Sequence, residues 1–369
     1  MTIGQKLWQV NWTLICFLII LVGVGCAMLY SAAGASWNPW AERQLTRFSV
    51  GILILLIIAV IDIRFWLRHA YTLYLLVFGL LIAVEVMGII GMGAKRWINL
   101  GFIQMQPSEI MKVALVLALA RYFHGRSLED IGRPIFLIIP LFMVVAPVFL
   151  LLRQPDLGTA IMLTMTAGVI FFLAGVRTWH FGLVVGVIIA SLPVGWTMLH
   201  GYQKMRILTF LNPENDPLGA GYHIMQSKIA LGSGGVFGKG YLAGTQSHLN
   251  FLPEKQTDFI FTMLAEEFGI VGGLLLLIIY AIIIIYCFVI ALRVHNQFGR
   301  LVALGITGNL FLYIFINIAM VMGLLPVVGI PLPLVSYGGT AMLSILIGFG
   351  FIICANVHRD VRMGRHGYR

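Results

Sequence analysis

Leu252-Pro253-Glu254-Lys255-Gln256-Thr257-Asp258-Phe259 ends the one long polar segment of this chain and leads directly into a hydrophobic run that opens with Ile260. An acid at such a junction lies where a water-exposed loop meets a membrane helix. Burial beside lipid disfavours the charged form of a carboxylate, which makes it a better proton acceptor near neutral pH. We therefore predict that Asp258 is a general base. The alternative is a helix N-cap, because Thr257 and Asp258 directly precede a helical run.

The composition indicates an integral membrane protein. Of 369 residues, 60% are hydrophobic and only 10% are charged, whereas a soluble domain carries roughly 25% charged residues. The net charge of +10 comes from basic residues scattered between apolar runs. This pattern favours topology signals and phosphate-bearing lipids over a DNA-binding face. The cysteines have no ligand-like spacing, which predicts reduced packing residues at Cys16, Cys26, Cys287 and Cys354.

Apolar runs long enough to cross a bilayer recur along the whole chain, since a spanning helix needs about 20 apolar residues. We predict about ten spans, at residues 12–30, 47–62, 71–91, 108–123, 135–152, 157–175, 181–199, 259–292, 301–322 and 340–357. The expected fold is an all-α polytopic membrane protein with one integral-membrane domain over residues 1–369. The first run follows Lys6 and leads into more membrane protein, so we interpret it as a signal anchor.

Lys and Arg are concentrated in the short connections on one side of this arrangement. The positive-inside rule therefore places both termini in the cytoplasm. The long connection of residues 200–258, between the seventh and eighth helices, then faces outward, which in a bacterium is the periplasm. No ATP is present there, so any bond formed on that side must be driven by a substrate that is already activated.

Two irregular segments are predicted near the outer side. Ile330-Pro331-Leu332-Pro333, followed by Ser336-Tyr337-Gly338-Gly339, cannot be regular helix and is expected to line a cavity. In the long connection, an amphipathic helix at residues 222–231 precedes a glycine-rich turn at residues 232–240. This turn resembles a phosphate-binding loop but has Ser233 and Gly240 at two required positions, so we reject a nucleotide site.

Charged residues near the outer helix ends are further candidates. Glu85 lies inside the third apolar run, where an ionisable group is a functional hypothesis by default; the alternative is structural pairing with Lys112 or Arg96. Glu109 and Lys112 are spaced i, i+3, which predicts either a local ion pair of little energetic value or a lysine that supplies positive charge to a diphosphate. Arg96 and Arg153 are expected to converge on the same place, which suits a phosphate-bearing headgroup.

The remaining polar positions have simpler interpretations. Asp156 is expected to be the N-cap of the sixth helix. Glu266 and Glu267, about two turns after Asp258, either tune it by repulsion or pair with Lys255. A stripe at i, i+4 and i+8 predicts hydrogen bonds between helices, from Asn309, Tyr313 and Asn317. The sequence shows no metal signature; no cofactor is evident, and a divalent cation is allowed but not indicated.

Five long motifs resemble the shape, elongation, division and sporulation (SEDS) family, in the same order and over nearly the whole chain. They are AKRWINLGFIQMQPSEIMK, RQPDLGTA, LNPENDPLGAGYHIMQSKIALGSGGVFGKG, LPEKQTDFIFTMLAEEFG and LPVVGIPLPLVSYGG. Within the family, Gly219-Ala220-Gly221-Tyr222-His223 and Gly244-Thr245-Gln246-Ser247 are similar to the RodA branch rather than to the division paralogue FtsW.

The resemblance implies a peptidoglycan glycosyltransferase with ten transmembrane helices in the bacterial inner membrane. Such an enzyme polymerises lipid II on the periplasmic face for cell elongation and rod shape, with a class B penicillin-binding protein and the elongation machinery as partners. It joins sugars by inverting β-1,4 transfer and releases undecaprenyl diphosphate.

The resemblance also assigns roles to residues. The essential aspartate of the family falls on Asp258. The other motif positions of the family, which we predict to bind substrate, correspond to Arg96, Gln106, Glu109, Lys112, Gln154, Asp156 and the Ser336–Gly339 turn with Ser336 and Gly338. We add Lys239 as a further substrate-binding candidate and Glu85, Glu266 and Glu267 as supporting residues. The division enzymes have an acid where Asn250 stands, so a second carboxylate is not implied there.

Three other interpretations remain open. A flippase for the same lipid-linked precursor would also need many helices and intramembrane charges, although no two-fold repeat of broken helices is visible. A scaffold would only recruit the penicillin-binding protein. The division paralogue would carry out the same chemistry at midcell.

Overall fold

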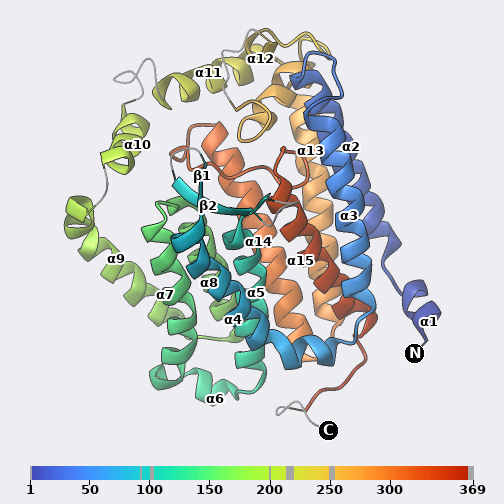
Figure 1. Ribbon diagram of the computed structural model, residues 1–369, viewed down its shortest axis with the longest axis vertical. Coiled ribbons are helices and arrows are strands. Elements are labelled where there is room, and N and C mark those ends of the chain that lie inside the picture. The colour runs from blue at the N-terminus through green and yellow to red at the C-terminus, as the bar shows by residue number, and fades with distance from the viewer. Residues whose placement is uncertain are drawn as a thin grey trace.

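The computed structural model describes residues 2–91, 94–99, 104–198, 201–212, 220–248 and 254–364. The described chain is a bundle of long helices with a small sheet near one end (Figure 1). A helix lies at each of the ten predicted runs: α2 (Trp12–Ala32), α3 (Trp40–Val60), α4 (Ile63–Met87), α5 (Pro107–His124), α7 (Ile138–Arg153), α8 (Leu157–Ala174), α9 (Thr178–Met198), α13 (Ile260–Arg293), α14 (Gln297–Val321) and α15 (Gly339–Val357). The predicted all-α polytopic fold is confirmed.

In the described ranges, eight of these helices are long and apolar enough to cross a membrane, α7 together with the short helix before it. Helix α5 has 18 residues, as α8 does, but it carries Glu109, Lys112 and Arg121 and is not among the eight. The other helices are α1 (Ile3–Trp8), α6 (Leu128–Ile131), the 3-10 helix η1 (Pro134–Leu137), α10 (Gly201–Leu211), α11 (Ala220–Ser233) and α12 (Thr245–His248). Helix α11 confirms the helix predicted at residues 222–231.

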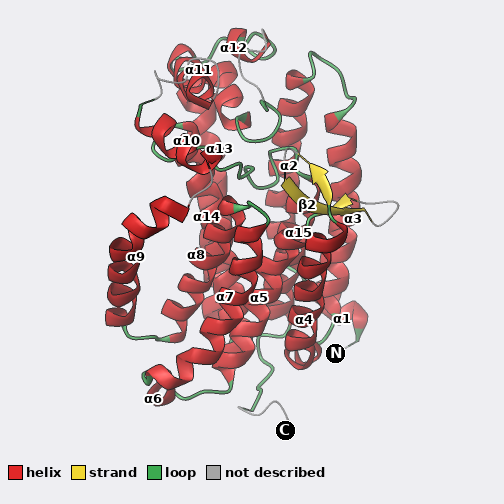
Figure 2. Cartoon of the chain, turned by 60° about the vertical axis from the view of Figure 1, so that its left-hand side comes forward, coloured by secondary structure: helices red, strands yellow, loops and turns green. Residues whose placement is uncertain are grey.

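Different elements lie at the two ends of the bundle. Helix α1 and the C-terminal end of α15 lie together at one end, whereas α11 and α12 lie at the opposite end, which we call the outer end (Figures 1 and 2). Strands β1 (Ile89–Gly91), β2 (Ala94–Asn99) and β3 (Gln104–Met105) connect α4 to α5 as an antiparallel sheet. Residues 94–99, which include Lys95, Arg96 and Trp97, therefore form a strand between the end of α4 and the start of α5.

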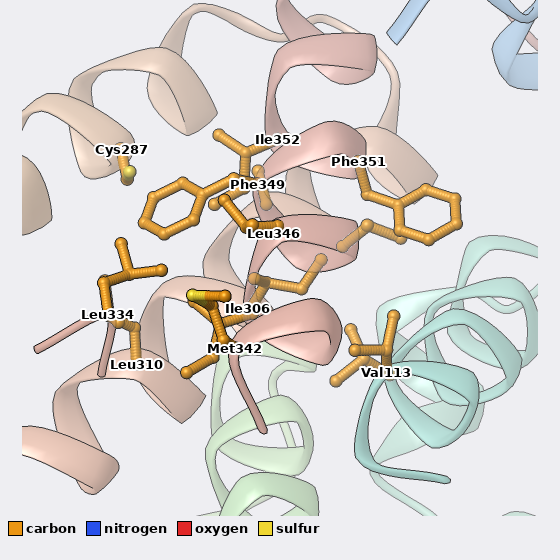
Figure 3. Packing of buried hydrophobic residues seen from close by; sticks show 14 of the residues in the cluster. Val113, Cys287, Ile306, Leu310, Leu334, Met342, Leu346, Phe349, Phe351 and Ile352 are labelled. Atoms are coloured by element: carbon orange, nitrogen blue, oxygen red, sulfur yellow. The ribbon is translucent and has the colours of Figure 1, made fainter. Parts of the chain in front are cut away.

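Helix α15 lies at the centre of the apolar core. Its buried residues lie on all sides, as expected of a helix surrounded by other helices. Figure 3 shows Leu346, Phe349 and Ile352 of α15 near Cys287 of α13. All four cysteines are free, as predicted, and three are buried; Cys16 is exposed, so the packing role predicted for it is wrong.

Helix α13 folds back on itself, which corrects the prediction of one continuous span at 259–292. Gly269 has φ 67° and ψ −165°, outside the helical region. The Phe261 ring lies 3.5 Å from the place of a Cβ on Gly273, whereas a straight helix would separate the two Cα atoms by about 18 Å. Residues 260–268 therefore form a short arm that runs to the outer end, and residues 270–293 form a long arm that returns.

The segment between α14 and α15 is irregular, as predicted, and residues 332–336 within it are buried. Leu332, Leu334, Val335 and Ser336 are each at most 2% exposed. Buried backbone groups need partners, and the Gln44 amide of α3 supplies two of them by donating to the carbonyls of Leu334 (3.3 Å) and Ser336 (3.1 Å). The cavity expected beside this segment stays a prediction.

Gly269→Ala is expected to destabilise the protein. The backbone conformation of Gly269 is almost restricted to glycine and costs about 1–3 kcal/mol for other residues. A Cβ there would also lie 2.4 Å from the Gly238 nitrogen. Thermal unfolding in detergent measures the loss. Gly79→Ala in α4 is the matched control, because nothing lies within 4 Å of its Cβ position; equal melting temperatures for the two variants would contradict the role of Gly269.

Candidate functional site

Asp258 lies half-buried in the turn of residues 254–259, immediately before the short arm of α13. Its Oδ2 atom lies 3.6 Å from the place of a Cβ on Gly329. The Asn317 amide of α14 donates to the Asp258 carbonyl (3.0 Å) and to the Ile330 carbonyl (2.7 Å). The carboxylate therefore faces the irregular segment between α14 and α15, inside the bundle.

Further hydrogen bonds hold the same two segments together. The Ser336 hydroxyl donates to the Thr257 carbonyl (2.6 Å), and the Tyr337 N–H donates to the Gln256 carbonyl (2.8 Å). In the same turn, burial lowers the pKa of the Lys255 amine. The predicted site residues Asp258, Ser336 and Gly338 thus belong to one pair of interlocked loops.

The N-cap interpretation of Asp258 is wrong. Helix α13 begins at Ile260, its N-cap is Phe259, and that residue makes no side-chain capping bond. Asp156, by contrast, is the N-cap of α8 as predicted, since its Oδ1 accepts from the Thr159 N–H (3.4 Å). A structural capping role therefore explains Asp156 but does not explain Asp258.

A second polar cluster surrounds Asp156. Its carboxylate accepts from the Gln106 amide (3.2 Å) and pairs with Arg96 (3.9 Å), which also donates to the Pro155 carbonyl. The neighbouring Gly158 packs so closely that its Cβ would lie 2.7 Å from the Val328 carbonyl oxygen. Because Val328 adjoins Gly329, this cluster and Asp258 contact the same short segment.

A third cluster joins α5, α14 and α15 in the core. The Lys112 ammonium donates to Glu109 (2.7 Å) and to the Tyr313 hydroxyl, and the Tyr313 hydroxyl donates to Glu109 (2.6 Å). The Ser344 hydroxyl donates to the same carboxylate (3.3 Å). The predicted ion pair is confirmed, and with Lys112 only 2% exposed it is a buried pair rather than a surface one.

The polar stripe on α14 forms hydrogen bonds to other helices through Asn309 and Tyr313, as predicted, and to a loop through Asn317. Asn309 accepts from the Thr166 hydroxyl of α8 (2.9 Å), Tyr313 contacts Glu109 of α5, and Asn317 holds the Asp258 loop. The expected convergence of cations is not seen, because Lys112, Arg96 and Arg153 each bind a different carboxylate.

The structure gives Glu85 a different ion-pair partner from the predicted ones and places it nearer the end of its helix than expected. It pairs with Arg153 (3.2 Å), not with Lys112 or Arg96, and it lies two residues before the end of α4 with a third of its side chain exposed. Gln154, the next residue after Arg153, donates its amide to the Leu81 carbonyl (2.9 Å). Both contacts connect the outer end of α4 to the C-terminal end of α7.

The remaining predicted residues lie at the outer end of the short arm. Glu266 is fully buried and accepts from the Lys239 ammonium (2.9 Å), while Glu267 accepts from the Ser31 hydroxyl of α2. Lys239 is therefore the partner that the structure gives Glu266, where the sequence suggested Lys255. The substrate-binding role of Lys239 stays a prediction.

Sequence reasoning missed two residues of α3 at this site. Gln44 is fully buried and binds the 334–336 backbone, as described above. Arg47 lies with its guanidinium 4.9 Å from the centre of the Tyr337 ring and against Gly339, the first residue of α15. Arg47 is the first residue of the predicted span at 47–62, so the sequence did contain a signal. The sequence analysis used it only with the other Lys and Arg residues, to orient the helices.

Among the described residues, no group of three or more His, Cys, Asp or Glu side chains is placed to hold a metal ion.

These features define a class: a multi-pass helical membrane protein with a half-buried aspartate between two irregular segments. The FtsW/RodA/SpoVE family of cell cycle proteins has a model that matches residues 9–362, and this chain belongs to that family. It is 44% identical to the peptidoglycan glycosyltransferase MrdB of Escherichia coli K12, over 95% of this chain and 94% of that protein.

Solved structures agree with this assignment. A chain from a peptidoglycan synthase complex, described as coordinating polymerization and crosslinking, superposes with a TM-score of 0.83 at 32% identity, covering 95% of this chain and 98% of that one. The rod shape determining protein RodA of Thermus thermophilus superposes with a TM-score of 0.72 at 29% identity, covering 96% and 98%.

Lys112→Met is expected to destabilise the protein by about 3–5 kcal/mol, because it leaves the Glu109 carboxylate buried without its counter-charge. The double variant Lys112→Met/Glu109→Gln should recover much of this loss. Arg153→Met is the matched control, since it breaks the partly exposed pair with Glu85 and should cost at most about 1 kcal/mol. Thermal unfolding of the four proteins checks the order, and a double variant less stable than Lys112→Met would refute it.

Proposed function

We propose that this chain is a peptidoglycan glycosyltransferase that polymerises lipid II, with Asp258 as its general base. The observation that carries the proposal is the position of Asp258, held between the 254–259 turn and the segment of Gly329 and Ile330 by the Asn317 amide. The enzyme class is supported by the name and the 44% identity of the Escherichia coli relative. The chemistry below follows from this assignment.

In the proposed reaction, the Asp258 carboxylate removes the proton from the 4-hydroxyl of the acceptor sugar. The hydroxyl oxygen attacks the anomeric carbon of the lipid-linked glycan, and the bond from that carbon to the diphosphate oxygen breaks. Undecaprenyl diphosphate leaves with the bonding electrons, and inversion produces a β-1,4 bond. The activated leaving group supplies the driving force, so no nucleotide is needed.

The leaving diphosphate carries negative charge that nearby cations stabilise. Arg96 is more accessible than Lys112, because its side chain is 30% exposed whereas that of Lys112 is 2% exposed. Arg47 is a third cation, beside the Ser336–Gly339 turn. We assign Arg96 and Arg47 to the diphosphate and give Lys112 a positioning role through its contacts with Glu109 and Tyr313.

The setting of the enzyme follows from the charge pattern and the relatives. We place both termini in the cytoplasm of a bacterium and the outer end in the periplasm, since Lys and Arg favour the cytoplasmic side. The partner is a class B penicillin-binding protein, supported by the similarity to a chain of a peptidoglycan synthase complex. Identity of 44% with MrdB against 35% with an FtsW protein of Coxiella burnetii favours elongation over division.

Asp258→Asn should lower the polymerisation rate by about 10²–10⁴-fold, because the amide does not accept the hydroxyl proton. The measurement is glycan chain length from labelled lipid II, with purified protein and partner in detergent. Glu254→Gln is the matched control: it lies in the same turn, is exposed and should keep the wild-type rate.

The same assay separates the alternatives. A flippase forms no polymer without a bilayer, so a wild-type protein that never lengthens glycan would refute the enzyme proposal. A scaffold predicts that Asp258→Asn leaves growth and cell shape intact while the complex persists. Full polymerisation by Asp258→Asn would remove Asp258 from the mechanism.

A further inference from the structure

The short arm of α13 connects the outer end of the protein to Asp258. Asp258 directly precedes the arm, and every residue from Ile260 to Glu267 is buried. A helix rises about 1.5 Å per residue, so Glu266 lies about 12 Å along the arm from Asp258. Because a helix of this length is stiff, any force that holds its outer end also sets the position of Asp258.

The outer end of the arm is held by the glycine-rich turn of residues 234–240, which we call the clasp. The N–H groups of Lys239 and Gly240 donate to the carbonyls of Glu266 and Glu267 (3.0 Å each). In return, the N–H groups of Ile270 and Val271 donate to the carbonyls of Gly235 (3.0 Å) and Val236 (3.2 Å). The clasp therefore replaces helical hydrogen bonds that are broken where α13 folds back at Gly269.

The Glu266 side chain of the arm accepts several hydrogen bonds from the clasp and from the residues that follow it. Its Oε1 atom accepts from the Lys239 ammonium (2.9 Å), the Thr245 hydroxyl (3.2 Å) and the Gln246 N–H (2.9 Å). The Lys239 ammonium also donates to Thr245 (2.8 Å). One buried carboxylate thus joins the arm to the glycine-rich turn and to α12.

A second contact lies halfway along the arm. The hydroxyls of Ser227 in α11 and Thr262 in the arm are 2.9 Å apart, and Ser227 also donates to the Val321 carbonyl at the end of α14 (2.8 Å). Residues 220–248 therefore contact the arm at two places, Thr262 and Glu266. Asn317 of α14 binds the backbone at Asp258, just before the inner end of the arm.

We propose that Lys239 and Glu266 are positioning residues that set the place of the Asp258 carboxylate through the short arm. This inference rests on the proposed polymerase function. It also gives Lys239 a role that differs from the substrate binding predicted from the sequence.

Lys239→Met and Glu266→Gln test the proposal in the polymerisation assay, with turnover and KM for lipid II measured separately. A displacement of about 1 Å at a reacting group costs about 10²-fold, so turnover should fall by about 10–100-fold with KM unchanged. The double variant should lose less than the sum of the two single losses, because both changes break the contact between Lys239 and Glu266. Lys239→Arg should restore most of the turnover.

Lys228→Met is the matched control, since Lys228 is an exposed lysine of the same outer segment with no ion-pair partner in the described residues. It should leave turnover unchanged. Thr245→Val, which removes a hydroxyl donor to Glu266, provides a milder variant if Lys239→Met does not fold, and it should lower turnover with KM unchanged.

Three results would overturn the inference. A higher KM with turnover kept in Lys239→Met would show that Lys239 binds substrate. Additive losses in the double variant would show two independent roles, and wild-type turnover in a folded Lys239→Met or Thr245→Val would show that the clasp does not act on Asp258. Failure of the wild-type protein to make polymer would instead refute the proposed function.

Discussion

The Asn317 amide group holds together the two irregular segments on which the candidate site depends. It donates to the carbonyls of Asp258 and Ile330, which belong to segments about 70 residues apart in the sequence. Backbone that is not helical leaves N–H and C=O groups without local partners, and at membrane depth water does not supply them. The irregular segments are therefore stable only where side chains from neighbouring helices complete their hydrogen bonds.

Gln44 and Ser336 also complete the hydrogen bonds of irregular backbone. Gln44 donates to two carbonyls of the 334–336 backbone, and Ser336 both accepts from the Leu332 N–H (2.7 Å) and donates to the Thr257 carbonyl. With their backbone satisfied in this way, the loops place a carboxylate inside a helical bundle. An acid on a regular apolar helix would instead face lipid or tightly packed side chains.

Charge inside the bundle is arranged in compact, mutually neutralising groups. Glu109 and Lys112 share one buried network with Tyr313, and Glu266 and Lys239 share another at the outer end. A buried ion pair need not add stability, because desolvation opposes the attraction, but removing one partner is costly. Such pairs therefore specify one arrangement of helices, here at α5 with α14 and at the clasp with α13.

The amino-acid sequence by itself determined the helical class, the positions of the helical runs, the irregular segment at residues 330–338, the cap at Asp156 and the stripe on α14. Each of these depends on local composition or on spacing along one helix, which a single chain displays directly. Asp258 was also identified from the sequence, because its neighbours form a long family motif at the junction of polar and apolar residues.

The tertiary structure alone decided which residues meet. Nothing in the apolar run after Ile260 showed that Gly269 reverses its direction, because glycine is common in membrane helices and the fold-back requires the hydrogen bonds of the distant 234–240 turn. The partner of Glu85 was assigned wrongly for a related reason: ion pairing depends on where neighbouring helices end, and Arg153 reaches Glu85 from a helix more than 50 residues away. Contacts between residues distant in sequence follow from packing, and packing is a property of the whole bundle.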